Sequence, residues 1–133
     1  GWMAFYESNY LRLLRLIPEL ERLDGHFQSH VAGDCSLHVE ILERSRHTIT
    51  LSLTYFFFDD DGRRVADPDM QVRAYLDGKL AEAMSLTGNH RHAELRRLCF
   101  RHRRELDRRW RQNIVLNKWL DYLMDQGHLV LER

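Results

Sequence analysis

The chain has 133 residues, of which 44% are hydrophobic and 30% are charged, with 20 basic and 20 acidic side chains. This length and composition favour one folded domain over residues 1–133, and they exclude a disordered chain or a simple polycation. The balanced total hides an asymmetry, because residues 1–88 carry a net charge of −5 and residues 89–112 carry +6.

The N-terminal region has the apolar spacing of a helix. Tyr6, Tyr10 and Leu13 recur at helical intervals, which predicts a helix over residues 3–17. Pro18 disfavours the α conformation of the residue before it, so the helix is expected to end there. Residues 18–25 are interpreted as a polar connector.

From residue 26 the hydrophobic pattern alternates with a period of two, which predicts strands. An Asp77-Gly78 pair joins the last two expected strands and is a strong signal for a hairpin with positive φ at both positions. The segment 58–69 is acidic and is expected to be an exposed loop. The predicted strands cover residues 26–32, 36–43, 47–57, 70–76 and 79–86.

The register of the first three strands follows from parity. Apolar side chains on adjacent strands must share one face, which requires turns with an odd number of residues. Three-residue turns place Ile41 beside Ile49 and Val31 opposite Leu37.

The helical period returns after Gly88. Residues 90–104 are rich in arginine and fit either a helix or a long ordered loop, whereas residues 105–126 predict a long helix that ends at Gly127. The tail over 128–131 is a candidate edge strand.

These elements predict an α+β fold. It comprises an N-terminal helix, an antiparallel meander of about five strands, an Arg-rich connecting segment over 89–109 and a C-terminal long helix. The helices are expected to pack on one face of the sheet and to leave the other face open.

The open sheet face supplies the first candidate site. The predicted register places His38 in one row with His30 and Ser52, and it places Arg73 opposite Glu82. Imidazole and carboxylate groups perform acid–base chemistry near neutral pH. The alternative is a solvated face with one cross-strand ion pair. The ligand-binding candidates are His38, Glu40, Arg73, Tyr75 and Glu82.

The Arg-rich segment supplies the second candidate site. Nine arginines occur within residues 89–112, and guanidinium groups bind phosphate oxygens in a fork. On an ideal helix, five of them form one positive stripe. The alternative is a solvated face that pairs with the acidic segment 58–69. The phosphate or nucleic-acid candidates are Arg97, Arg101, Arg104, Arg108 and Arg111.

We expect no metal and no cofactor. At strand spacing at most two of the His/Cys side chains around Cys35 converge, and those around Cys99 converge only if residues 90–104 fold compactly, so neither group supplies the four ligands of a zinc site. The sequence lacks the glycine-rich nucleotide-binding motifs and the common hydrolase motifs. We also expect reduced cysteines, no signal peptide, no membrane contact and a cytoplasmic location.

Four groups of residues resemble the YqiB-like family, a domain of unknown function in small uncharacterised proteobacterial proteins. The groups are Asn9-Tyr10 with Leu13, Leu16 and Pro18; Glu43, Arg46 and Thr48; Val72-Arg73, Tyr75, Asp77 and Ala81-Glu82; and Gln112-Asn113, Leu116, Trp119-Leu120 and Gly127. The resemblance covers most of the chain and departs between residues 89 and 109. It implies a bacterial cytoplasmic protein and supplies no activity.

Three functions remain open at this point. The first is a non-enzymatic binding or interaction module with a protein partner or a second copy of the chain. An alternative is an RNA or nucleotide-phosphate binder that uses the Arg-rich segment 91–111. A second alternative is an enzyme with its site on the open sheet face, which requires His38, Glu40, Arg73 and Glu82 to converge in a concave pocket.

Overall fold

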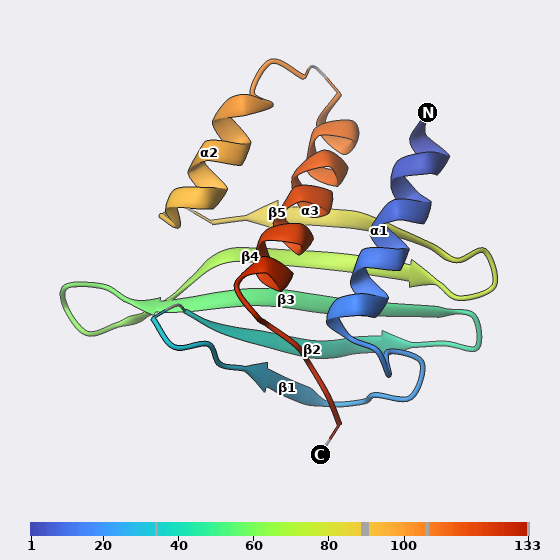
Figure 1. The fold of residues 1–133 in the computed structure, drawn as a ribbon, viewed down its shortest axis with the longest axis horizontal. Coiled ribbons are helices and arrows are strands. Elements are labelled where there is room, and N and C mark those ends of the chain that lie inside the picture. The colour runs from blue at the N-terminus through green and yellow to red at the C-terminus, as the bar shows by residue number, and fades with distance from the viewer. Residues whose placement is uncertain (34, 89–90, 106, 133) are drawn as a thin grey trace.

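A computed structural model describes residues 1–33, 35–88, 91–105 and 107–132, and it confirms the predicted α+β class (Figure 1). The order of elements is helix, five strands and two helices. They are α1 (Trp2–Leu16), β1 (His26–Ser29), β2 (Ser36–Arg44), β3 (Thr48–Phe58), β4 (Arg64–Tyr75), β5 (Leu80–Thr87), α2 (Ala93–Arg101) and α3 (Arg108–Asp125).

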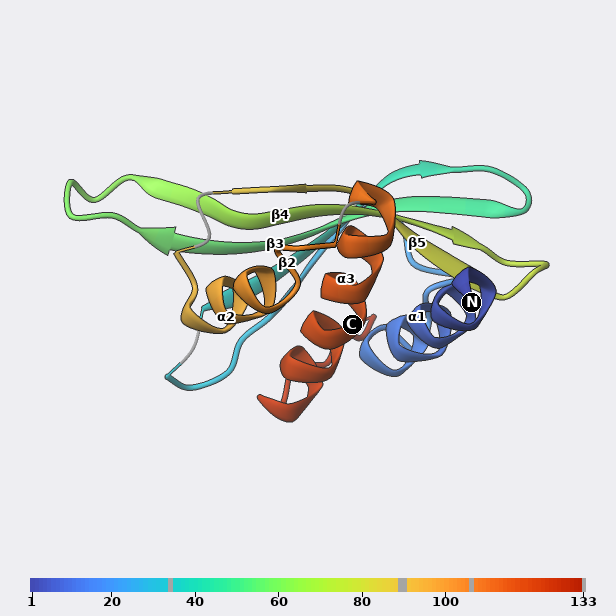
Figure 2. The ribbon, with the colours of Figure 1, turned by 90° about the horizontal axis from the view of Figure 1, so that it is seen from above.

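The five strands form one antiparallel sheet in the order of the chain, from β1 to β5. All three helices lie on the same side of this sheet (Figure 2). The central strand β3 sends Ile49, Leu51, Leu53 and Tyr55 to the helix side, where each is at most 1% exposed. The core therefore lies between one sheet face and the helices, as the alternation of β3 predicted.

The first helix ends as predicted, but the connector after it is not polar throughout. Ile17 has left the helical conformation, with φ of −126° and ψ of 79°, directly before Pro18. Leu20 and Leu23 are buried in the core. Arg44 of β2 donates hydrogen bonds to the carbonyl oxygens of both leucines, which fastens the connector to the sheet.

The predicted strand parity is correct, but the register is shifted by two residues. Ile41 pairs with Leu51 and not with Ile49, because β2 bulges between Ile41 and Glu43. On the other side, Leu37 faces Ser29 and not Val31. A shift of two keeps every side chain on its predicted face and changes only which residues are neighbours.

The segment 58–69 is shorter as a loop than expected. The strand β4 already begins at Arg64, and Asp67 is fully buried. The Asp67 carboxylate accepts a hydrogen bond of 2.8 Å from the backbone N–H of Arg91. Gly88 packs against this carboxylate so closely that a Cβ atom would lie 2.4 Å from Asp67 Oδ1, so only glycine fits there.

The last hairpin has the predicted pairing with a different turn. Tyr75 pairs with Leu80 and Arg73 with Glu82, as Asp77-Gly78 at the centre requires. The positive φ, however, lies at Lys79.

The Arg-rich segment is not one continuous helix. It forms α2, a turn after Arg101 and then α3, which begins at Arg108 and not at residue 105. The Asp107 carboxylate caps α3 by accepting a 3.1 Å hydrogen bond from the N–H of Trp110, a local preference that breaks the run. Leu106, at the start of the predicted helix 105–126, lies outside the described residues.

The C-terminal tail is not an edge strand. It crosses the helix-covered side of the sheet, and the backbone N–H of Val130 donates to the carbonyl oxygen of Leu16 at 2.9 Å (Figure 1). The side chains of His128 and Val130 in this tail are both buried.

Candidate functional site

The five ligand candidates of the open sheet face fall into two groups. His38 and Glu40 lie on β2, whereas Arg73, Tyr75 and Glu82 lie on β4 and β5. The strands β3 and β4 lie between Glu40 on β2 and Glu82 on β5. Three strand spacings therefore separate these two residues, which amounts to about 14 Å. The structure therefore does not bring these groups into one pocket.

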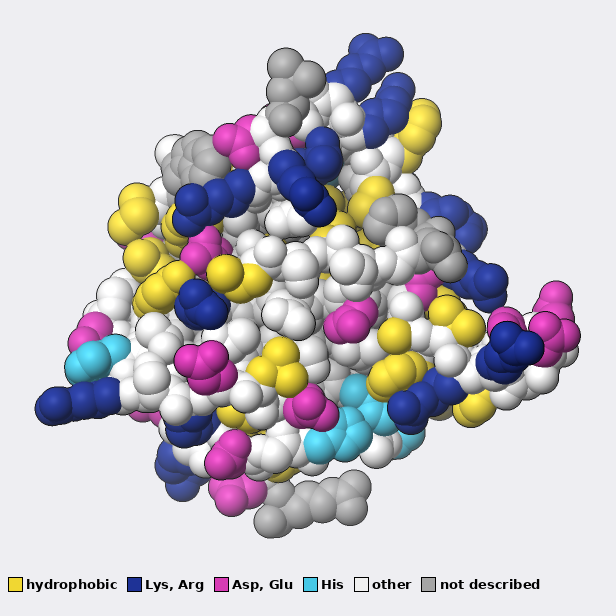
Figure 3. Space-filling view, turned by 180° about the vertical axis from the view of Figure 1, so that it is seen from behind, with side chains coloured by type: hydrophobic (Ala, Val, Ile, Leu, Met, Phe, Trp, Pro, Cys, Tyr) yellow, Lys and Arg dark blue, Asp and Glu magenta, His cyan; other side chains and the backbone are white. Residues whose placement is uncertain are grey.

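The first group is centred on a pair of histidines. His26 Nε2 and His38 Nδ1 are 2.9 Å apart, and their rings are stacked. The Phe56 ring packs nearly perpendicular to the His38 ring. Burial lowers the pKa of His38, and the charges of His26, Arg64 and His30 lower it further. Figure 3 shows histidine side chains gathered near the lower edge of this face, at the β1 and β2 side.

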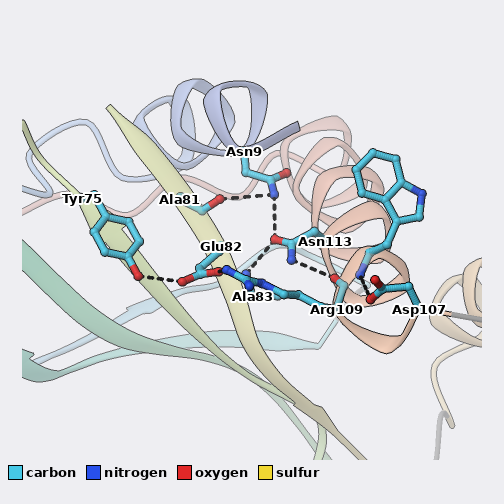
Figure 4. A network of polar contacts seen from close by, with 9 residues as sticks. Asn9, Tyr75, Ala81, Glu82, Ala83, Asp107, Arg109 and Asn113 are labelled. Carbon is cyan, nitrogen blue, oxygen red and sulfur yellow. Dashed lines mark hydrogen bonds and ion pairs between the residues drawn. The ribbon is translucent and has the colours of Figure 1, made fainter. Parts of the chain in front are cut away.

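The second group is centred on Glu82, which is 7% exposed (Figure 4). Its carboxylate accepts a 2.6 Å hydrogen bond from the Tyr75 hydroxyl and a 2.8 Å charged hydrogen bond from Arg109 of α3. Arg73 is opposite Glu82 along the backbone, as predicted, but its Nε donates to the Thr50 hydroxyl. The partner that neutralises Glu82 therefore comes from the Arg-rich segment and not from the neighbouring strand.

The bond to Glu82 also changes Tyr75. Hydrogen bonding of its hydroxyl to Glu82 raises the pKa of Tyr75, and burial adds to the increase. Tyr75 therefore stays protonated well into the alkaline range and acts as a hydrogen-bond donor to the carboxylate.

Two asparagines close part of the free edge of β5 beside this group (Figure 4). Asn113 Oδ1 accepts a 2.9 Å hydrogen bond from the N–H of Ala83, and Asn9 Nδ2 donates to the carbonyl oxygen of Ala81 at 3.4 Å. The two side chains also bond each other at 3.2 Å, and Asn113 Nδ2 donates to the carbonyl oxygen of Arg109. Their amides thus take the place of a sixth strand.

Asn9, Asn113 and Arg109 were not predicted as site residues from the sequence. The available signal was an asparagine within the apolar stripe of each long helix, a position that disfavours helix and demands a buried hydrogen-bond partner. The partner could not be assigned, because the two helices are far apart in sequence.

A groove of about 720 Å³ lies between β5 and the first turns of α3. Glu82 is set into its wall, and Met84 is 42% exposed. The lining residues are Glu82, Ala83, Met84, Ser85, Asp107, Arg108, Arg109 and Gln112.

The five arginines of the predicted stripe have different surroundings. Arg97 makes a bidentate ion pair with Glu94, and half-buried Arg111 donates to the carbonyl oxygen of Glu105. Three others are exposed, and within the described ranges no ion pair joins them to a carboxylate or to the acidic segment 58–69. These three are Arg101, Arg104 and Arg108.

An exposed aromatic ring lies among these arginines. Phe100 is 65% exposed, and the Arg103 guanidinium stacks over its ring at 3.8 Å and bonds to its carbonyl oxygen. We call Phe100, Arg101, Arg103, Arg104 and Arg108 the basic turn surface. Figure 3 shows Lys and Arg side chains along the upper edge of the molecule, where α2, α3 and their connection lie.

The described residues contain no group of three or more His, Cys, Asp or Glu side chains that could hold a metal ion. Cys35 and Cys99 are not joined by a disulfide, and burial raises the pKa of the Cys99 thiol. Within the part of the chain that the structure describes, no helix is both long and apolar enough to cross a membrane.

A family model described as a protein of unknown function (DUF1249) matches residues 12–129. No curated protein matches the chain. No solved structure matches it.

Proposed function

The chain belongs to the DUF1249 family of proteins of unknown function, and on that premise we propose that it is a non-enzymatic binding module for single-stranded RNA. The observation that carries this proposal is the basic turn surface, where Arg101, Arg104 and Arg108 are exposed and none of them has an ion-pair partner among the described residues. Unpaired surface guanidinium groups are available to phosphates.

The composition of this surface favours a single strand over a duplex. Single-stranded nucleic acids are held by cations along the backbone and by aromatic rings on which unstacked bases lie. Phe100 offers such a ring, with one face already occupied by Arg103. An RNA base stacked on Phe100 would extend the stack that Arg103 forms with this ring, while the RNA phosphates contact the neighbouring arginines.

The open sheet face supports binding more than catalysis. Glu82 is bonded to Tyr75 and Arg109, and His38 and His26 lie three and four strands away from it. A catalytic acid and base need a shared position for the reacting atom. The geometry supports no such shared position for these groups.

Fluorescence anisotropy with a labelled single-stranded RNA of about 12 nucleotides tests the proposal. We expect the logarithm of the association constant to fall linearly with the logarithm of the salt concentration. The slope should be about −2 to −3, since three or four cations contact phosphates. The triple variant R101A/R104A/R108A should lose at least about tenfold in affinity and most of the slope.

A matched variant controls for net charge. The triple variant R15A/R46A/R63A also removes three exposed arginines, all outside the basic turn surface, and should bind RNA almost as tightly as the parent chain. Equal losses in the two variants would contradict a localised site. Binding of inorganic phosphate or free nucleotides at millimolar concentration, with no binding of the RNA, would replace RNA by a small phosphorylated ligand.

We also propose a bacterial cytoplasmic protein, because the sequence resemblance to the YqiB-like family implies it. Fractionation of source cells, with antibody detection of the full chain, tests the location. Recovery outside the cytoplasmic fraction would contradict it.

A further inference from the structure

The groove between β5 and α3 is a second interaction surface, separate from the centre of the basic turn surface. We propose that it binds an extended, acidic peptide segment of a partner protein, which adds to the outer edge of β5. This inference does not depend on RNA binding, although Arg108 borders both surfaces.

The outer edge of β5 is the reason for an extended ligand. β5 is the last strand of the sheet, and an edge strand offers backbone N–H and C=O groups to a further strand. Asn9 and Asn113 cover this edge at Ala81 and Ala83. The groove follows the next part of the strand, through Met84 and Ser85, where α3 forms the opposite wall.

The wall charges are the reason for an acidic ligand. Arg108 is exposed, and the side chain of Arg109 remains 58% exposed although it bonds Glu82. The Glu82 side chain is only 10% exposed and is paired with Arg109, whereas Asp107 is exposed and caps α3, so the lining presents two exposed guanidinium groups and one exposed carboxylate. The groove therefore presents more accessible positive than negative charge to a ligand.

The geometry of the groove favours a peptide in which acidic side chains alternate with other side chains. Glu82 holds Arg109 in place before any ligand arrives, which lowers the entropy cost of binding. Met84 supplies an exposed apolar side chain on the strand wall. A strand presents successive side chains to opposite sides, so acidic side chains facing α3 alternate with side chains that point away.

An array of peptides of about eight residues tests the inference with the full chain. In one set Asp or Glu alternates with Val, Ile, Thr or Tyr, and in a matched set Lys or Arg replaces each acidic residue. We expect binding to acidic peptides only. Hydrogen exchange with the tightest peptide should show new protection of backbone amides within residues 84–87.

The variant Met84→Glu places a negative charge in the groove and should weaken the tightest peptide about tenfold or more. Met3→Glu is the matched control, because Met3 is 56% exposed on α1 and is not among the groove-lining residues. Its affinity for the peptide should equal that of the parent chain.

Five outcomes would overturn the inference. The first four are binding to neither peptide set, equal binding to both sets, equal losses in the two methionine variants, and full competition of the peptide by the RNA probe. A dimer of the parent chain that Met84→Glu converts to a monomer in sedimentation would also overturn it, because the occupant would then be a second copy. If Met84→Glu loses peptide binding and keeps RNA binding, the result distinguishes this inference from the proposed function.

Discussion

The charged side chains of this protein are stabilised in two different ways, by an ion pair or by exposure to solvent. Glu82 is nearly buried and is compensated by Arg109, because an unpaired charge in the interior is strongly unfavourable. Arg101 and Arg104 are exposed, where a guanidinium needs no partner. The buried pair therefore organises the structure, and the exposed arginines remain available to a ligand.

His38 provides a prediction at this scale. Burial is the main cause of its lowered pKa, and the guanidinium of Arg64 contributes because it lies over Phe56 next to the histidine. Replacing Arg64 with Gln should raise the pKa of His38 towards the ordinary value of 6.5. A titration of the imidazole ring by NMR measures the change.

The same pKa shift has a consequence for stability. Because the folded state holds the proton of His38 less tightly than the unfolded state, the free energy of unfolding should fall as the pH drops below 6.5.

The control for the titration of Arg64→Gln is Arg63→Gln, which removes a neighbouring exposed charge and should leave the His38 titration unchanged. A larger shift in Arg63→Gln than in Arg64→Gln would contradict the assigned cause.

At the scale of elements, periodicity predicted which segments form strands and helices, and parity predicted which face each side chain occupies. The neighbours across strands were not predictable, because the bulge after Ile41 depends on packing that a single strand does not reveal. The start of α3 was predicted at residue 105 instead of Arg108 for another reason. Asp107 was counted as a charge, although its side chain caps a helix.

Asn113 provides a prediction at the scale of elements. Its buried amide joins α1, β5 and α3, since it bonds Asn9, the N–H of Ala83 and the carbonyl oxygen of Arg109. Asn113→Ala leaves these groups without their partner and should lower the free energy of unfolding by about 2–3 kcal/mol. Urea denaturation measures the loss.

The adjacent residue controls for helix propensity. Gln112 lies on the same turn of α3 at the groove and is half-buried. Gln112→Ala should change the free energy of unfolding by less than about 0.5 kcal/mol. Similar effects of the two substitutions would show that Asn113 does not connect the elements.

At the scale of the whole molecule, the charge asymmetry of the sequence becomes a spatial arrangement. The Arg-rich segment is divided between a charge that pairs with Glu82 of β5, at Arg109, and charges that face solvent, at Arg101 and Arg104. Composition alone predicted a positive region but not this division, because the division depends on contacts between β5 and α3. The tail was also unpredictable, since its few apolar residues fit an edge strand equally well.

The tail provides the last prediction. His128 is 3% exposed and bonds the Tyr55 hydroxyl at 2.6 Å and the Ser29 hydroxyl at 2.9 Å, so it connects the C-terminus to two strands. His128→Ala leaves both hydroxyls buried without this partner and should lower the free energy of unfolding by about 2–4 kcal/mol. In a cooperative fold this loss appears as a lower urea midpoint with an unchanged m-value.

Leu129→Ala separates the role of the imidazole from that of the tail as a whole. The Leu129 side chain is 46% exposed, and the bond from its backbone N–H to Ser29 does not need the side chain. Its urea midpoint should stay close to that of the parent chain. If His128→Ala instead increased only the local hydrogen exchange of residues 128–131 and left the midpoint unchanged, the tail would be a peripheral segment, and the sheet and helices would hold together without it.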